Sequence, residues 1–172
     1  MIARVDNREG RSGRVDTDHP RWQIPVVRWL GLDVGEKTIG VAISDEEEVI
    51  ATPLRTLSRH GGMRDLEAVA AVLHELGAGG LVLGLPLQMN GREGDAARRV
   101  RDLGQRLATH LRCPVEHWDE RFSTVQAERA LLEGDLTRRR RRQVIDKVAA
   151  TIILQSFLDH RSSGMPGQGA PA

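Results

Sequence analysis

Residues 26–45 constrain the fold of this chain more than any other segment, because they hold two extended runs joined by a tight turn that contains glycine. The first run is apolar and rich in β-favouring residues up to Asp33. In the second run Ile39, Val41 and Ile43 alternate with small residues. This pattern predicts a β-hairpin.

Asp33 is the unusual residue of the hairpin, because it ends a strand that must be largely buried. A buried carboxylate loses hydration and needs a partner to remain charged, and a cation would serve. Alternatively, Asp33 only accepts hydrogen bonds from the turn amides around Gly35, as aspartate often does in turns. The hairpin by itself leaves both interpretations open.

The rest of the chain alternates between strand and helix patterns. Residues 48–57 are expected to form a third strand, with Pro53 indicating an edge position or an irregularity. The spacing then predicts, in order, a helix from Met63 that Gly77 ends, a buried strand at 80–85, a helix at about 95–110, a strand at 114–118, a helix that begins at Ser123 or Thr124 and ends at Gly134, and a last helix at about 143–159.

Three strands followed by alternating helices and strands predict an α/β fold. We expect a mixed sheet, with three antiparallel strands and then parallel crossover strands, flanked by helices. One folded domain would cover residues 26–160. The polar composition predicts a disordered N-terminal extension over residues 1–25 and a flexible tail over 161–172.

The composition is that of a cytoplasmic protein without a membrane partner. No apolar run approaches the roughly 20 residues that a membrane span requires, and the amino terminus lacks the apolar core of a secretory signal. The single cysteine, Cys113, has no partner for an internal disulfide, which fits a reducing compartment.

The arginines gather in two regions, although the formal net charge is only +1. One region holds Arg98, Arg99, Arg101, Arg106 and Arg112, and the other is the unbroken run at 138–142. Clustered guanidinium groups suit phosphate recognition, which predicts a nucleic-acid partner. For the first region a solvated helix face is the alternative. Five consecutive arginines need an anionic partner or a loop that tolerates their repulsion.

Asp146 lies on the apolar side of the last predicted helix. At about 100° per residue, it shares a face with Ile145, Ala149, Ala150, Ile153 and Phe157. A carboxylate among these side chains requires a cation or a donor. The alternative is an aspartate in the first turn that favours the helix dipole.

Three carboxylates could therefore meet at one place. Asp33 and Glu120 follow strands that the topology can bring together, and Asp146 faces that sheet. Mg²⁺ or Mn²⁺ would compensate their charge, and a pair of such ions could support phosphodiester hydrolysis. Asp119 is the reserve candidate, because strand alternation cannot decide whether Asp119 or Glu120 faces the site.

Five segments resemble the YqgF/RuvX family, in the same order: LGLDVGEKTIGVAISD at 30–45, ATPLRTL at 51–57, VLGLPLQMNGREG at 82–94, DERFSTVQAE at 119–128 and VIDKVAATIILQSFLD at 144–159. The resemblance implies an RNase H-like fold and a metal-dependent nuclease. Such proteins were first proposed as Holliday junction resolvases and are now usually described as processing the 16S rRNA precursor. Asp33, Glu120 and Asp146 would be the catalytic and metal-binding triad.

Further residues are expected to bind substrate. By motif match these are Gly84, Pro86, Arg121 and Thr124, to which we add Arg139, Arg140, Arg141 and Lys147 as phosphate-binding candidates. Gly84 and Pro86 could instead be ordinary strand-ending residues, and Arg121 could simply pair with Asp119.

The function expected is hydrolysis of nucleic acid, with ribosomal precursor particles as partners. The alternatives are a Holliday junction resolvase or DNA nuclease of recombination and repair, and an RNA-binding module without turnover. A sugar-kinase or actin-like ATPase would need two such lobes, and 172 residues supply one. The sequence leaves open whether the protein is a monomer or a weak homodimer.

Overall fold

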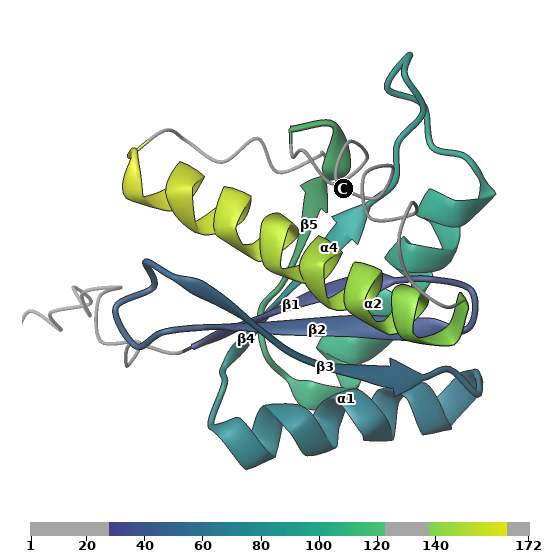
Figure 1. Cartoon of the computed structure of the whole chain (residues 1–172), viewed down its shortest axis with the longest axis horizontal. Helices are drawn as coiled ribbons and strands as arrows, with labels where there is room; N and C mark the ends of the chain where they lie inside the picture. The colour runs from purple at the N-terminus through teal and green to yellow at the C-terminus, as the bar shows by residue number, and fades with distance from the viewer. Residues whose placement is uncertain (1–27, 123–137, 165–172) are drawn as a thin grey trace, which may run out of the picture.

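A computed structural model describes residues 28–122 and 138–164 of the chain. Figure 1 shows the arrangement of these elements. Their order is β1 (Trp29–Val34), β2 (Thr38–Ser44), β3 (Ala51–Ser58), α1 (Gly62–Leu76), β4 (Gly80–Leu85), α2 (Asp95–Leu111), β5 (Val115–Asp119), the short 3₁₀-helix η1 (Glu120–Phe122) and α4 (Arg138–Ser162).

The five strands form one mixed sheet in the order β3-β2-β1-β4-β5. Strand β1 pairs antiparallel with β2, and β2 pairs antiparallel with β3. The pairs β1–β4 and β4–β5 are parallel. The predicted mixed α/β sheet is thereby confirmed. Strand β3 lies at an edge, and its register with β2 shifts between Val41 and Ala42, close to Pro53, so both features that the proline indicated are present.

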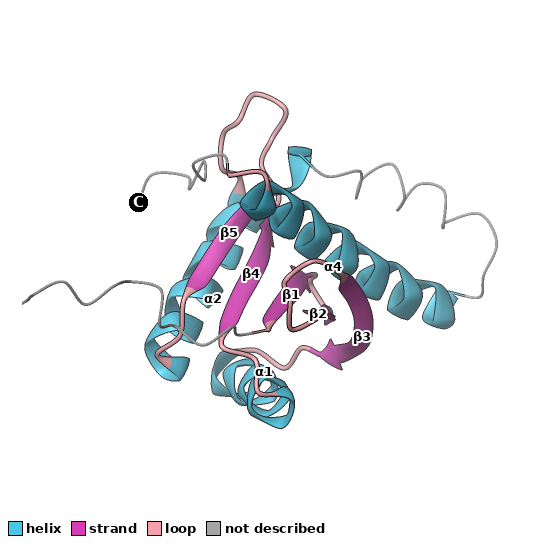
Figure 2. Ribbon diagram, turned by 90° about the vertical axis from the view of Figure 1, so that its left-hand side faces the viewer, coloured by secondary structure: helices cyan, strands magenta, loops and turns pink. Residues whose placement is uncertain are grey.

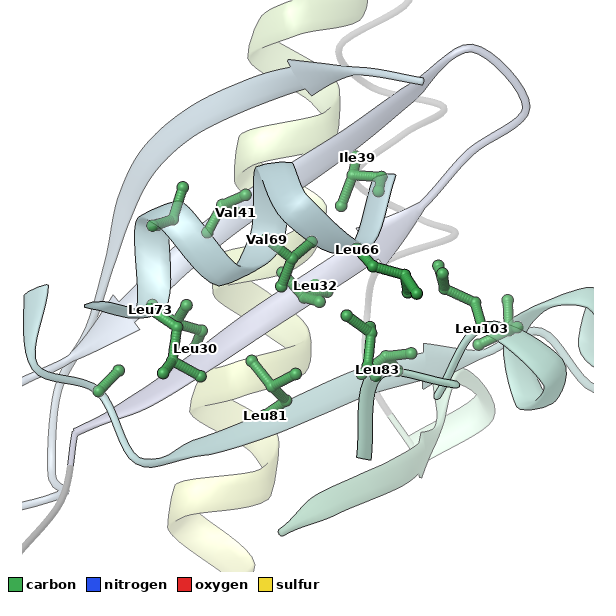
Figure 3. Close-up of a cluster of buried hydrophobic side chains, with 14 of the residues drawn as sticks. Leu30, Leu32, Ile39, Val41, Leu66, Val69, Leu73, Leu81, Leu83 and Leu103 are labelled. Atoms are coloured by element: carbon green, nitrogen blue, oxygen red, sulfur yellow. The ribbon is translucent and has the colours of Figure 1, made fainter. Parts of the chain in front are cut away.

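Helices cover both faces of the sheet, with α4 on one face and α1 and α2 on the other (Figure 2). Strand residues alternate between these faces. Leu30, Leu32 and Leu83 belong to the cluster under α1 and α2, which Figure 3 shows in close-up. Trp29 and Val82 belong to the cluster that packs against α4. Each central strand therefore contributes to two cores.

Helix α4 is longer than the sequence analysis expected. It begins at Arg138 instead of about 143, so the expectation of a later start was wrong. Arginine has high intrinsic helix propensity, and neither glycine nor proline interrupts the run. The helix also continues past residue 160, where Arg161 lies over the Trp29 ring at 4.9 Å and forms a 3.2 Å ion pair with Glu48.

Some expectations lie outside the described residues. These are the disordered extension at 1–25, the helix expected from Ser123 or Thr124 to Gly134, and residues 165–172 of the tail expected at 161–172. The first two residues of that expected tail belong to α4. Within 28–122 and 138–164, no helix is both long and apolar enough to cross a membrane.

Candidate active site

Asp33 lies near the end of β1 on the face that α4 covers. Its side chain is 4% exposed, and it stands directly opposite Gly40 of β2 in the antiparallel ladder. Trp29 of the same strand alternates onto this face as well. The strand register thus fixes a buried carboxylate beside α4.

Gly40 lets α4 approach the sheet next to Asp33. A Cβ atom on Gly40 would overlap the backbone carbonyl of Asp146. Since Gly40 is the cross-strand neighbour of Asp33, this close approach brings Asp146 to the same end of the sheet. Figure 1 shows α4 crossing the sheet. The Asp146 side chain accepts a 2.6 Å hydrogen bond from Thr38 Oγ1, which fixes its orientation.

The close approach continues along α4. A Cβ atom on Gly31 of β1 would lie 2.6 Å from Leu154 Cβ. A Cβ atom on Gly84 of β4 would overlap Ile153 and would lie 2.7 Å from Glu120 Oε1. Glycines on β2, β1 and β4 therefore allow α4 to pack closely against the sheet. Gly84 also leaves room for the Glu120 side chain.

Glu120 is the first residue after β5 and begins η1. It is 4% exposed. Asp119 is held differently, because both of its carboxylate oxygens accept hydrogen bonds from Arg121, the shortest at 2.6 Å. Glu120 lines the same hollow as Asp33, whereas Asp119 pairs with Arg121, so Glu120 is the better placed of the two candidates.

Asp33, Glu120 and Asp146 line one hollow of about 310 Å³, which we call the carboxylate hollow. Arg59, Arg99 and Pro86 line it too, as does the exposed Glu36 of the turn after β1. Three elements far apart in the sequence contribute the three carboxylates. The structure therefore brings together the triad that the sequence singled out.

The carboxylate set fits a hard divalent cation. All three side chains offer oxygen ligands, which Mg²⁺ and Mn²⁺ prefer. Within residues 28–122 and 138–164, no three side chains of the ligating types stand close enough to form a ready metal cage. An open set is compatible with Mg²⁺, which keeps several waters and commonly binds one or two carboxylates together with a substrate phosphate.

Arg59 supports the turn after Asp33. Its Nη1 donates a 2.7 Å hydrogen bond to the Gly35 carbonyl, and its Nε lies 3.1 Å from Asp65 Oδ2. Burial by itself would raise the pKa of Asp65, but hydrogen bonds from the His60 and Gly61 amides and from Arg59 outweigh it and lower that pKa. Asp65 is therefore an ionised anchor for Arg59.

Sequence reasoning missed Thr38, Gly40 and Arg59. Gly40 carried a usable signal, since a glycine between Ile39 and Val41 in a strand indicates close approach of another backbone. Thr38 and Arg59 carried none, because a hydroxyl and a guanidinium at strand ends are common.

The predicted substrate-binding residues have different surroundings. Pro86 lines the carboxylate hollow, whereas Gly84 is buried beneath α4. Arg121 pairs with Asp119, which is the alternative role considered for it above. Its Nη1 would lie 3.4 Å from a Cβ atom added to Gly91. Lys147 is half-buried beside Asp146 on α4. Thr124 and the side chains of Arg139, Arg140 and Arg141 lie outside the described part of the chain.

Comparison with known proteins links this chain to nucleases. The sequence model of the RuvX family, described as a Holliday junction resolvase, matches residues 27–160. A protein of Paramagnetospirillum magneticum named "Putative pre-16S rRNA nuclease" is 50% identical over 135 residues, which cover 78% of this chain and 87% of the relative. A protein of the same name from Caldanaerobacter subterraneus subsp. tengcongensis is 48% identical over 138 residues, covering 80% and 99%.

Solved structures share the fold. The RuvC protein of Thermus thermophilus, in complex with a Holliday junction substrate, superposes with a TM-score of 0.52 at 14% identity and covers 80% of this chain and 96% of RuvC. A second RuvC structure from that organism gives a TM-score of 0.51 at 18% identity. The likeness identifies the fold as RNase H-like.

Proposed function

The chain belongs to the RuvX family, and from this premise we propose that it is a metal-dependent nuclease that hydrolyses RNA phosphodiester bonds in maturation of the 16S rRNA precursor. One observation carries the proposal. Asp33, Glu120 and Asp146, from β1, η1 and α4, line one hollow although they are far apart in the sequence. The names of the relatives support the choice of precursor rRNA as substrate.

In this proposal Asp33, Glu120 and Asp146 hold Mg²⁺ or Mn²⁺. A pair of such ions would activate the attacking water and stabilise the leaving oxygen. The burial of Asp33 and Glu120 limits competition from bulk water, and the hydroxyl of Thr38 holds Asp146 in one orientation. The side chains thus supply the negative charge and the order that the cations require.

The proposed substrate contacts are electrostatic. Arg59 and Arg99 line the carboxylate hollow and would attract the phosphates. Pro86 would shape its wall. The remaining candidates for substrate contact are Gly84, Arg121, Thr124, Lys147, Arg139, Arg140 and Arg141. A cytoplasmic location and association with ribosomal precursor particles are further parts of the proposal.

The test is hydrolysis of end-labelled precursor rRNA, single-stranded RNA, single-stranded DNA and a four-way DNA junction, each with Mg²⁺, Mn²⁺ or EDTA. We expect metal-dependent cleavage of the precursor rRNA. Asp33→Asn, Glu120→Gln and Asp146→Asn should abolish cleavage and leave the circular dichroism spectrum unchanged. Glu67→Gln, an exposed carboxylate on α1, is the matched control and should cleave like the unaltered protein.

Each other outcome favours an alternative. Preferred cleavage of the four-way junction would favour a resolvase. RNA binding without cleavage in any lane would favour a non-catalytic RNA-binding module. Cleavage at the unaltered rate in one of the three variants would remove that residue from the proposed triad.

A further inference from the structure

A second hollow adjoins the carboxylate hollow. It has a volume of about 410 Å³ and lies between the start of α1 and residues 98–106 of α2. The two hollows share Arg59 and Arg99 in their linings, so they lie side by side. We call the second one the arginine hollow, because Arg98 and Arg106 also line it.

The arginine hollow carries an excess of positive charge. Among the described residues that line it, four are arginines and two are carboxylates, Asp65 and Asp102, and Asp95 lies beside Arg98 at its edge. Asp65 is 2% exposed, and its charge is compensated by hydrogen bonds from Arg59 and from the His60 and Gly61 amides. The carboxylate of Asp102 is solvated, with 69% of the side chain exposed.

The arginines on α2 are available to an external anion. Arg98 lies 3.7 Å from Asp95 and Arg106 lies 3.8 Å from Asp102, and all four side chains are well exposed. Exposed pairs of this kind contribute little to stability, so a phosphate can replace the carboxylate. Positions 98, 102 and 106 are four residues apart and lie on one side of the helix. The cationic groups therefore line up along α2.

We propose that the arginine hollow is a second phosphate-binding site for the RNA strand that is cut in the carboxylate hollow. The strand would pass from Asp33, Glu120 and Asp146 over Arg59 and Arg99 and continue along Arg98 and Arg106. A chain of phosphodiesters fits this arrangement, because it supplies negative charges at regular intervals to guanidinium groups that bind phosphate bidentately. The inference rests on the proposed nuclease function and adds the path of the substrate.

The experiment measures RNA affinity in the Asp146→Asn background, which is expected not to cleave. The variant combines Arg98→Gln with Arg106→Gln, because these two arginines line the arginine hollow and do not line the carboxylate hollow. Affinity for a single-stranded RNA of about 20 nucleotides is measured from low to high salt. Each lost phosphate contact lowers the slope of log affinity against log salt by about 0.7, so the double variant should lower it by about 1.4. The same change should leave the affinity of a dinucleotide unaltered.

Arg112→Gln is the matched control, because Arg112 is an exposed arginine at the other end of α2, outside both hollows. An Arg98→Gln/Arg106→Gln variant with the affinity and slope of this control would overturn the proposed path. Equal losses for the dinucleotide and the long RNA would overturn it too. A single-stranded DNA of the same length, run in parallel, distinguishes a backbone path from RNA recognition.

Failure of the function and failure of the path are distinguishable. If the unaltered protein cleaves nothing but the salt slope falls in the double variant, the nuclease proposal is wrong and the phosphate path stands. If RNA is cleaved and the slope does not change, the nuclease proposal stands and the path is wrong.

Discussion

The two faces of the central sheet are built in opposite ways. Under α1 and α2, large aliphatic side chains such as Leu32, Leu83 and Leu103 fill the space between layers (Figure 3). Under α4, the sheet presents Gly31, Gly40 and Gly84, and the helix backbone lies almost on the strands. The α4 face also carries an apolar cluster with Trp29, Val82 and Phe157, but at the three glycines the helix lies closest to the strands.

This difference shows how the positions of site residues can be fixed within a small fold. A thick aliphatic layer stabilises by burial of apolar surface and tolerates small shifts. A helix that rests on glycines cannot shift without a collision, so Asp146 keeps its position relative to Asp33. The α4 face therefore sets the geometry of the site, while buried apolar side chains on both faces stabilise the fold.

The largest effect on stability is expected from Leu83→Ala. Leu83 is fully buried, and loss of its side chain should lower the free energy of unfolding by about 2–5 kcal/mol. Cleavage per folded molecule should persist, because α4 is not displaced. Urea denaturation measures the free energy of unfolding, and nuclease assays at urea concentrations below the unfolding midpoint measure cleavage per folded molecule. Leu54→Ala on the half-buried edge strand is the milder control. Complete loss of cleavage by folded Leu83→Ala protein would contradict the division between the two faces.

Gly40→Ala should affect both stability and cleavage. The added methyl group overlaps the Asp146 carbonyl, and overpacking of this kind costs about 1–3 kcal/mol. Because α4 must move away from β2, cleavage should fall far more than for Leu83→Ala at equal folded fraction. Gly94→Ala, where a Cβ would meet only the flexible Gln88 side chain at 3.3 Å, is the control. If Gly40→Ala cleaves like Gly94→Ala, close approach does not set the site.

Thr38→Val should separate orientation from packing. Valine keeps the shape but removes the 2.6 Å hydrogen bond to Asp146, and bonds to charged groups contribute about 1.5–3 kcal/mol. We expect a tenfold or larger drop in cleavage and a fall in the urea midpoint no larger than this contribution, with recovery of both in Thr38→Ser. Thr52→Val on the exposed edge strand β3 should change neither. Full activity of Thr38→Val would show that Asp146 needs no orientation by this hydroxyl.

The smallest effect concerns His117, which packs against Gly104 on the α2 side. Burial lowers its pKa, with Arg101 acting in the same direction and Glu93 opposing. The folded state therefore binds fewer protons than the unfolded state, so stability is present above about pH 6.5 and falls as the pH drops below it. The slope should stay below about 1.4 kcal/mol per pH unit.

Urea denaturation at several pH values measures the His117 contribution. His117→Gln should flatten the dependence between pH 5 and 7, whereas His110→Gln, an exposed histidine on α2, should not. An unchanged slope in His117→Gln would assign the titration to another group.

Local sequence patterns predicted most of the strands and helices. Alternation of apolar and small residues predicted β1 and β2, the helical stripe from Leu66 predicted α1, and the run at 80–85 predicted β4. The predicted start of α4 was too late, because the arginine run at 138–142 was judged by its charge and not by the high helix propensity of arginine. Asp33, Glu120 and Asp146 were singled out as carboxylates that burial makes unfavourable without partners.

The sequence by itself determined the order of the elements and the chemical type of the site, because periodicity and burial of charge are local properties. Only the tertiary structure decided that Glu120 lines the same hollow as Asp33 while Asp119 pairs with Arg121, since this depends on how the chain turns after β5. It also decided that Gly40 lets Asp146 approach and that Thr38 holds it. The two hollows that share Arg59 and Arg99 arise from segments that meet only after folding, and no local pattern encodes that contact.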